Sequence, residues 1–152
     1  MAKNINSEII EDFNSDYELP LADALERGVE DKKCYNYLLE VGGDYYVGFT
    51  TQSPDTRLTQ HIEDAKNGSL QKIHVALRRF GFLNEFSIIG EYKNEILGLV
   101  AEITNIKKYK ATLNSTIGGE GNKYKVVERK NSLNEDVFFV QSKEGKQNIL
   151  LK

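Results

Sequence analysis

The sequence predicts a mixed α/β (α+β) fold in which short antiparallel strands are covered by helices. Residues 34–50 alternate apolar and polar side chains on both sides of Gly42-Gly43-Asp44, which is typical of a β-hairpin. Residues 54–66 and 94–110 instead start with helix-capping side chains, and the second stretch carries apolar residues at helical spacing. Both patterns occur within one short region, so we expect strands and helices to share a core.

Length and composition limit what the chain can be. With 152 residues, of which 39% are hydrophobic, it has enough apolar sequence for one core with appendages. We expect no membrane partner, because no apolar run approaches the roughly 18 residues of a membrane span and no secretory signal pattern is present. The single cysteine, Cys34, excludes an intrachain disulfide and a zinc knuckle. We therefore expect a soluble cytoplasmic protein, located in the host cytoplasm if a phage encodes it.

The net charge of −3 is unevenly distributed. Residues 1–33 hold four Lys or Arg against nine Asp or Glu, residues 34–122 hold nine against ten, and residues 123–152 hold seven against four. These differences predict an acidic N-terminal arm with a short helix at 1–33, a central domain at 34–122 and a basic, β-rich extension at 123–152. Phosphate binding needs a local cationic surface, so the total charge neither supports nor excludes DNA as a partner.

Local signals place the elements of the first third of the chain. Residues 1–18 are polar and acidic, and we expect a loosely held arm there. Pro20 can begin a short helix that Gly28 ends. Residues 34–41 and 45–50 are expected to be the two strands of the hairpin.

Helices and one more strand are expected to follow. Ser53 is a plausible cap for a helix at 54–66 with Pro54 as its first residue. A second helix fits residues 70–80, with Ile73, Leu77 and Phe80 on one side, and residues 82–92 resemble a third strand. Asn94 then caps the long helix. Beyond residue 122, three short strands are expected, at 124–127, 137–141 and 148–151.

Two pairs of polar side chains could meet around the hairpin. Tyr35 and Tyr37 share one face of the first strand, because side chains alternate along a strand, and Tyr46 lies on the partner strand. Aromatic residues are common in strands, so core packing is the alternative interpretation. Arg57 and His61 stand four residues apart on one helix face, where a guanidinium can bind a phosphate and an imidazole can assist.

Other candidates lie further along the chain. His74 and Arg78 have the same spacing as Arg57 and His61, and we interpret His74 as a surface residue or an accessory phosphate contact. Glu102 falls near the apolar stripe of the long helix, where a carboxylate needs a partner or a metal ion. Asn114 precedes the glycines at 118, 119 and 121, which alone would predict only a turn.

The order of these residues resembles the GIY-YIG nuclease family across residues 34–122. In that family a tyrosine-containing strand is followed by a Tyr-(Ile/Val)-Gly strand, a helix with Arg and often His, a helix Glu, and an Asn before a glycine-rich turn. Here the matching segments are Tyr46-Val47-Gly48, Arg57 with His61, Glu102, and Asn114 ahead of Gly118-Gly119. The first motif departs from the family, because Tyr35-Asn36-Tyr37 stands in place of Gly-Ile-Tyr.

The resemblance implies a small three-stranded antiparallel sheet flanked by helices, and hydrolysis of DNA phosphodiester bonds to 5′-phosphate and 3′-hydroxyl ends. It implies one divalent ion, Mg²⁺ or Mn²⁺, bound by Glu102. Tyr37, or alternatively Tyr35, would accept the proton of the attacking water. Arg57 would stabilise the phosphoryl charge with Tyr46 and His61 as supporting donors, and Asn114 would orient the nearby loop.

Further basic residues are candidates for DNA contacts: His74, Arg78, Arg79, Lys123, Lys125, Arg129 and Lys130. A stand-alone phage or mobile-element endonuclease of the homing or host-attacking kind is the favoured interpretation. A restriction or repair nuclease is the alternative within the same chemistry, and a catalytically idle nucleic-acid- or protein-binding module is the alternative outside it. The sequence leaves the oligomeric state open, a dimer included.

Overall fold

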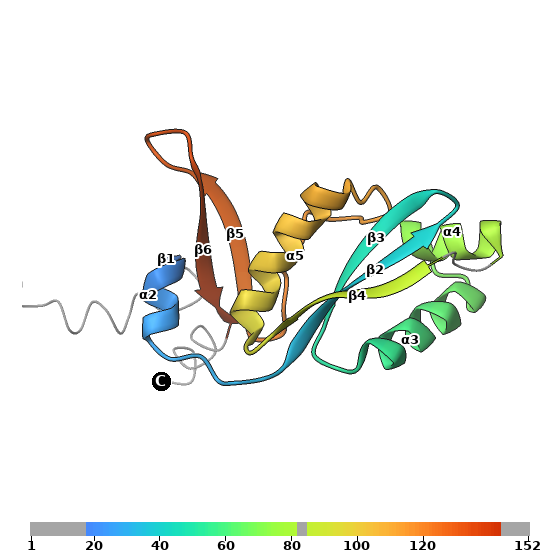
Figure 1. The fold of residues 1–152 in the computed structure, drawn as a ribbon, viewed down its shortest axis with the longest axis horizontal. Helices are drawn as coiled ribbons and strands as arrows, with labels where there is room; N and C mark the ends of the chain where they lie inside the picture. The colour runs from blue at the N-terminus through green and yellow to red at the C-terminus, as the bar shows by residue number, and fades with distance from the viewer. Residues whose placement is uncertain (1–17, 82–84, 144–152) are drawn as a thin grey trace, which may run out of the picture. The chain divides into compact units, whose positions relative to one another are not determined.

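The computed structural model describes residues 18–81 and 85–143, which belong to two compact units. One unit is Asp31–Gly118, and the other combines Met1–Glu30 with Gly119–Lys152. Each contains a three-stranded antiparallel sheet, so the predicted α+β class is confirmed (Figure 1). The division differs from the predicted one, because the N-terminal segment joins the C-terminal strands instead of standing alone.

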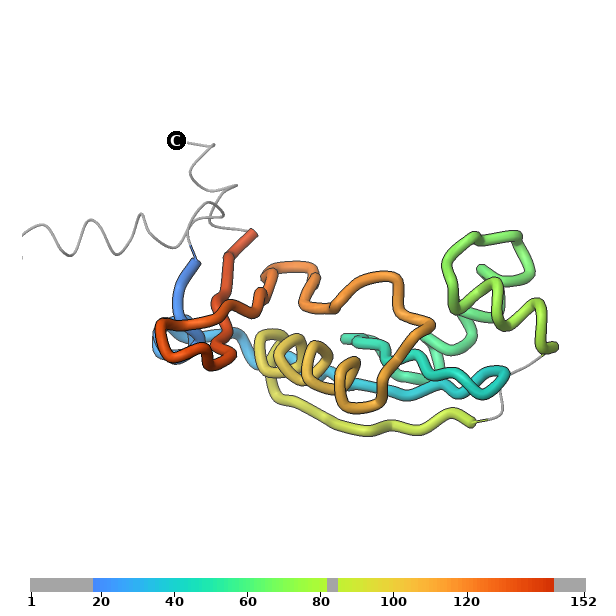
Figure 2. The backbone as a smooth tube through the Cα atoms, turned by 90° about the horizontal axis from the view of Figure 1, so that it is seen from above, coloured from blue at the N-terminus to red at the C-terminus, as the bar shows by residue number. Residues whose placement is uncertain are grey.

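The central unit consists of three strands and three helices. Its sheet has the order β3-β2-β4, and its elements are β2 (Cys34–Val41), β3 (Asp44–Thr50), α3 (Pro54–Lys66), α4 (Lys72–Phe80), β4 (Glu85–Tyr92) and α5 (Glu95–Tyr109). α3 and α4 lie on one face of this sheet and α5 lies on the other (Figures 1 and 2). Residues of β3, an edge strand, are therefore near helices on both faces.

The hairpin and the helix starts form where the sequence predicts them. Gly42 and Gly43 have φ angles of 62° and 88°, the left-handed conformation that the tight turn between β2 and β3 needs. Ser53 caps α3 by accepting a hydrogen bond from the amide of Thr56, and Asn94 caps α5 in the same way. The turn fixes the register of β2 against β3, and the two caps fix where α3 and α5 begin.

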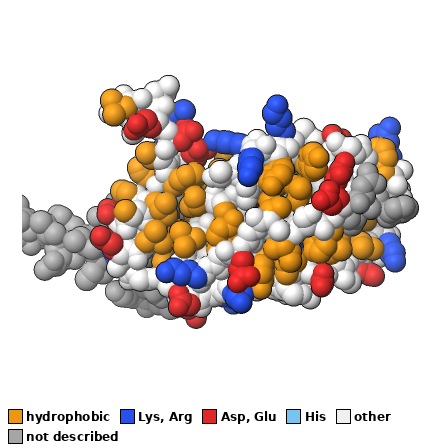
Figure 3. Space-filling model, viewed as in Figure 1, with side chains coloured by type: hydrophobic (Ala, Val, Ile, Leu, Met, Phe, Trp, Pro, Cys, Tyr) orange, Lys and Arg blue, Asp and Glu red, His pale blue; other side chains and the backbone are white. Residues whose placement is uncertain are grey.

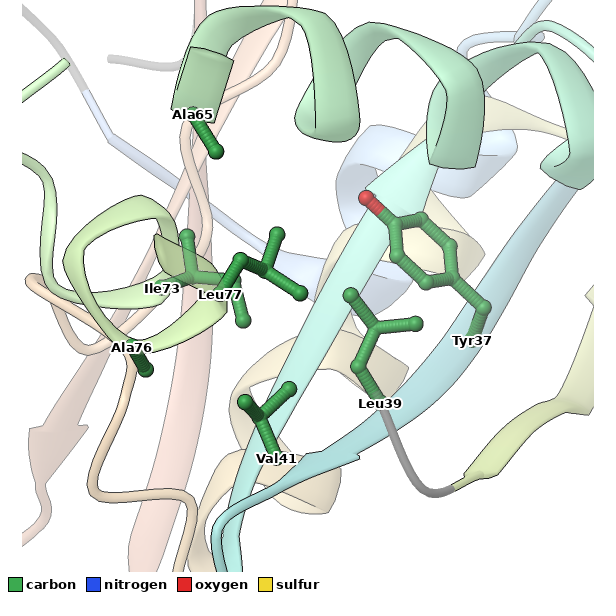
Figure 4. Packing of buried hydrophobic residues seen from close by; sticks show 7 residues of the cluster. All are labelled: Tyr37, Leu39, Val41, Ala65, Ile73, Ala76 and Leu77. Atoms are coloured by element: carbon green, nitrogen blue, oxygen red, sulfur yellow. The ribbon is translucent and has the colours of Figure 1, made fainter. Parts of the chain in front are cut away.

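The core under α3 and α4 is made by alternate residues of β2. Tyr37, Leu39 and Val41 point toward the helices and pack against Ile73 and Leu77 (Figure 4). The same β2 face was predicted from the alternation of its side chains. The predicted stripe of α4 is wrong at one position, because Phe80 is about half exposed, with its ring beside the Gly42 turn.

The opposite face of β2 is held against α5 by close packing and buried hydrogen bonds. A Cβ atom at Gly98 would lie 2.5 Å from the sulfur of Cys34, so glycine is what allows α5 to approach the sheet. The buried Asn36 donates to the carbonyl of Gly98 at 3.1 Å and accepts from the amide of Asn105 at 2.9 Å. Both groups of its side chain are thus satisfied, as burial requires.

The other unit is built from both ends of the chain. Its sheet has the order β1-β6-β5, and its elements are β1 (Leu19–Pro20), α2 (Leu21–Glu26), β5 (Tyr124–Lys130) and β6 (Asp136–Ser142). Leu19 pairs with Val140, and Ala24 of α2 is buried. The predicted short helix and two of the three predicted C-terminal strands are present. The third, at 148–151, lies outside the described residues, as does the predicted arm up to residue 17.

Within the described ranges, none of the helices combines the length and the apolar character that crossing a membrane would require.

Candidate active site

Two tyrosines from neighbouring strands meet on the α3 side of the central sheet. Tyr37 lies opposite Gly48 and Tyr46 lies opposite Leu39, so both project from the same face, with ring centroids 6.2 Å apart. The ring of Tyr37 crosses Gly48, where a Cβ atom would be 2.1 Å from the phenol carbon. The glycine of the Tyr-Val-Gly segment therefore leaves the space that Tyr37 fills.

Helix α3 adds a histidine and an arginine to this pair. Nε2 of the fully buried His61 is 2.6 Å from the hydroxyl of Tyr37, and its ring packs edge-on against Tyr46 at 5.2 Å. Arg57, one turn earlier and partly buried, donates from Nη1 to Oε1 of Gln60 at 2.8 Å. The guanidinium is close enough to lower the pKa of both phenols through its charge. The structure therefore brings Tyr37, Tyr46, Arg57 and His61 together.

The two tyrosines differ in access to solvent. Tyr37 is 0% exposed and its hydroxyl lies against His61. Its side chain has no surface on which an attacking water could bind, which argues against the predicted role of Tyr37 as the base. Tyr46 is partly exposed. Tyr35, the alternative base, lies opposite Thr50, two residues along β2 from Tyr37. Tyr46 is therefore the better-placed phenol of the paired tyrosines.

The prediction of His74 as a surface or phosphate-binding residue is wrong. Its side chain is 2% exposed, and its Nε2 is 2.8 Å from Nδ1 of His61. Its Nδ1 is 2.6 Å from the hydroxyl of Ser69 in the loop between α3 and α4. Tyr37, His61, His74 and Ser69 thus form one continuous hydrogen-bonded chain, which we call the relay.

Burial keeps both histidines of the relay neutral. Desolvation, reinforced by the charge of Arg57, lowers the pKa of His61 to about 3. Desolvation also lowers the pKa of His74, although the nearby Asp64 opposes the shift. Each imidazole therefore holds one proton and can donate at one nitrogen and accept at the other.

These depressed values make the stability of the protein depend on pH. His61 binds a proton in the unfolded chain below its ordinary pKa of 6.5, whereas the folded state resists protonation down to about 3. We expect the free energy of unfolding to be highest above pH 6.5 and to fall by about 2 kcal/mol from His61 alone between pH 7 and pH 5. Urea denaturation across this range measures the loss. The chain has only two histidines, so a His61→Gln variant should lose much of the slope; an unchanged slope would contradict the assignment.

The acidic candidate, Glu102, acts on the tyrosines through its charge from α5, the helix on the opposite face of the sheet. Glu102 is partly buried on α5, and its charge raises the pKa of both Tyr37 and Tyr46. Burial is the largest cause of the raised pKa of each phenol, and the Glu102 charge adds to it. The Glu102 carboxylate therefore raises the pKa of both phenols, whereas the Arg57 guanidinium lowers it.

Gly118 lies beside the Glu102 carboxylate. A Cβ atom at Gly118 would lie 3.3 Å from the Glu102 carboxyl carbon, so this glycine, at φ 92°, leaves the carboxylate room that a side chain would take. Among residues 18–81 and 85–143 there is no group of three or more His, Cys, Asp or Glu side chains suited to a metal ion. A single carboxylate matches an ion that keeps most of its water rather than zinc, which takes three or four protein ligands.

Asn114 fixes the strand that carries Tyr46. Its Oδ1 accepts from the amide of Val47 at 2.9 Å, and its Nδ2 donates to the carbonyl of the same residue at 2.8 Å. The amide of Leu113 also donates to the carbonyl of Tyr45 at 3.0 Å. The loop after α5 therefore takes the place of a neighbouring strand along β3.

Asn114→Ala should destabilise the protein by about 2 kcal/mol, because it leaves a partly buried amide and carbonyl of Val47 without partners. Urea denaturation at pH 7 measures the change. The matched control is Ser115→Ala at the next, exposed position, which should stay within about 0.5 kcal/mol of the parent. Equal stability of the two variants would show that the Asn114 contacts contribute nothing.

The predicted DNA-binding residues do not form a free cationic stripe. Lys123 pairs with Glu30 at 2.8 Å, Arg129 pairs with Glu18, and Lys130 pairs with Asp136 at 2.6 Å. On the face seen in Figure 3, Lys and Arg side chains are spread out, and several lie beside Asp or Glu. Exposed ion pairs of this kind contribute little, so phosphates can still compete for the cations.

The remaining candidates are exposed on α4 and β5. Arg78 donates from Nη1 to the carbonyl of Ala65, and Arg79 stacks over the ring of Phe80 at 5.6 Å. Lys125 is exposed on β5. These three side chains keep surface on which a phosphate could bind.

No family model, curated protein or solved structure matches this chain. The resemblance to the GIY-YIG family therefore stays a prediction from the sequence.

Sequence reasoning missed Ser69 and the contact between the two histidines. The signal for Ser69 was local: its hydroxyl accepts from the amide of Gln71, two residues later, at 3.3 Å, the geometry of a serine turn. The pairing of His61 with His74 had no local signal, because it depends on how α3 packs against α4.

Proposed function

We propose that the central unit is a metal-dependent endonuclease that hydrolyses DNA phosphodiester bonds and leaves 5′-phosphate and 3′-hydroxyl ends. The observation that carries this proposal is that the charges of Arg57 and Glu102, from helices on opposite faces of the sheet, both act on the tyrosine pair. A scaffold without chemistry has no need of a cation and an anion directed at the same two phenols.

The reacting base in this proposal is Tyr46. As the phenolate, formed by loss of its proton to solvent, Tyr46 takes a proton from a water molecule while the water oxygen bonds to phosphorus. The bond from phosphorus to the 3′ oxygen breaks, and that oxygen takes a proton from solvent. Burial raises the pKa of the Tyr46 phenol, and the charge of Arg57 lowers it. Arg57 thus favours the ionised phenol that a base requires and can donate to the phosphoryl oxygens as their charge grows.

Glu102 would hold the divalent ion, which would supply positive charge at the phosphate and at the leaving oxygen. That charge would act on Tyr46 in the same direction as Arg57 does. Asn114 holds the β3 backbone next to Tyr46 through its hydrogen bonds to Val47. Gly118 leaves space beside the Glu102 carboxylate.

Burial of Tyr37 suits a supporting role. Its hydroxyl contacts His61, and a hydrogen bond with the hydroxyl of Tyr46 affects the pKa of both phenols. Tyr37 can therefore stabilise charge on Tyr46 without meeting the substrate. This division of labour between the tyrosines differs from the roles expected from the sequence.

A nicking assay on supercoiled plasmid tests the proposal. We expect relaxed circles to appear with Mg²⁺ or Mn²⁺ and to disappear with a chelator, and the nicked ends should be ligatable, as 5′-phosphate and 3′-hydroxyl ends are. A folded protein that binds DNA but fails to nick it with either ion would support the alternative of an idle binding module. Repeating the assay on modified and unmodified DNA would show whether base modification matters.

A further inference from the structure

The relay links the buried tyrosine to the surface of the central unit. Three contacts connect its four side chains in sequence: Tyr37 to His61 at 2.6 Å, His61 to His74 at 2.8 Å, and His74 to Ser69 at 2.6 Å. Tyr37 and the two histidines are almost completely buried, and only Ser69, in the loop before α4, is partly exposed. Water can therefore reach one end of the relay more readily than its middle.

Neutral histidines force the hydrogen bonds of the relay to run in one direction. Each ring carries one proton, so a histidine that accepts from one neighbour must donate to the other. Either every bond points from Ser69 toward Tyr37, or every bond points from Tyr37 toward Ser69. The two arrangements differ in the tautomer of both histidines.

Ser69, at the surface end of the relay, favours the arrangement in which every bond points from Ser69 toward Tyr37. The hydroxyl oxygen of Ser69 already accepts from the backbone amide of Gln71, and its own proton can then be donated to Nδ1 of His74. In that arrangement Nε2 of His74 donates to Nδ1 of His61, and Nε2 of His61 donates to the oxygen of Tyr37. The hydroxyl proton of Tyr37 is then left to point at Tyr46.

We propose that Ser69 and His74 are positioning residues that fix the tautomer of His61, so that the Tyr37 hydroxyl donates its hydrogen bond to Tyr46. The consequence for catalysis rests on the proposed nuclease function, whereas the direction of the relay does not. Ser69 thereby influences the reacting phenol through three intervening side chains without touching substrate.

The charged groups around the relay come from the helices α3, α4 and α5. Arg57 acts on both histidines and both tyrosines, Asp64 and Arg78 act on His74, and Glu102 acts on the tyrosines. Both histidines are neutral between pH 6.5 and 8, so in this range the direction of the relay should not depend on pH.

Nitrogen-15 NMR of the imidazole rings tests the direction in the intact chain at pH 7. The two histidines give two ring systems, and each should show a proton on Nε2 and none on Nδ1. Protons on Nδ1 of both rings would overturn the proposal. This measurement needs no substitution and no activity.

Substitution of Ser69 tests its control over the relay. Ser69→Ala removes the donor to His74 and should mix the two tautomers, whereas Ser69→Thr keeps a hydroxyl and should preserve the parent spectrum. In the nicking assay Ser69→Ala should cut about tenfold more slowly at unchanged KM for DNA, the effect expected for one lost hydrogen bond, and Ser69→Thr should restore the rate.

The outcomes separate this inference from the proposed function. If the parent protein shows the expected tautomers but never nicks DNA, the proposed nuclease function is refuted and the proposed direction of the relay is supported. A parent that nicks DNA while Ser69→Ala keeps both the parent tautomers and the parent rate refutes the role of Ser69.

Discussion

Arg57→Ala and Glu102→Ala should each lower the rate of plasmid nicking by at least about 10²-fold, which brings it near the limit of detection. Removal of Arg57 takes away the cation that favours the ionised Tyr46 and that can bind the phosphoryl oxygens. Removal of Glu102 takes away the carboxylate that would hold the metal ion. Single-turnover cleavage with saturating Mg²⁺ measures the chemical step in both variants.

Matched controls separate loss of chemistry from loss of fold or of charge. Lys66→Ala removes one cation from the exposed end of α3, and Glu63→Ala removes one anion from an exposed position on the same helix. Both should cut DNA within about threefold of the parent, because exposed substitutions away from special contacts change stability little. If Arg57→Ala or Glu102→Ala cut as fast as these controls, the proposed roles would be wrong.

Gly48→Ala should produce the largest loss of stability among the substitutions considered, about 3 kcal/mol or more. The new methyl group would lie 2.1 to 2.5 Å from three atoms of the Tyr37 side chain, which is fully buried against His61. Overpacking of this kind costs about 1–3 kcal/mol, and displacing the Tyr37 hydroxyl from His61 adds the loss of a buried hydrogen bond. Urea denaturation and the disappearance of nicking activity together measure the effect.

Gly90→Ala is the control for Gly48→Ala. It also adds a methyl group to a strand of the same sheet, but its closest contact is the hydroxyl of Tyr92, at the far end of a partly exposed side chain. That ring can move outward, so Gly90→Ala should cost clearly less. Equal losses of stability in the two variants would mean that the packing of Tyr37 over Gly48 contributes no more than an ordinary strand contact.

Local signals predicted the elements well. The glycine turn of the hairpin, the capping of α3 by Ser53 and the capping of α5 by Asn94 each depend on residues only a few positions apart. The alternation of β2 also indicated which of its side chains share a face, whereas the burial of both faces had no local signal.

Long-range packing explains what the sequence did not predict. Tyr37 and His61 are 24 residues apart, and His61 and His74 are 13 apart. Their contacts therefore depend on how α3 and α4 pack against the sheet and against each other. The burial of Tyr37 follows from Gly48 on the neighbouring strand. The pairing of Leu19 with Val140 could not be predicted either, because β1 is only two residues long.

The strand formed by Leu19 and Pro20 has a practical consequence for dissecting the protein. Ion pairs link the two ends of the chain as well, since Arg129 contacts Glu18 and Lys123 contacts Glu30. A deletion that begins at Met1 and runs past Pro20 would uncover the edge of β6, and an effect on cleavage could then be misattributed to lost acidic residues. Truncations that stop before Glu18 avoid this ambiguity, while isolating Asp31–Gly118 requires two cuts made together.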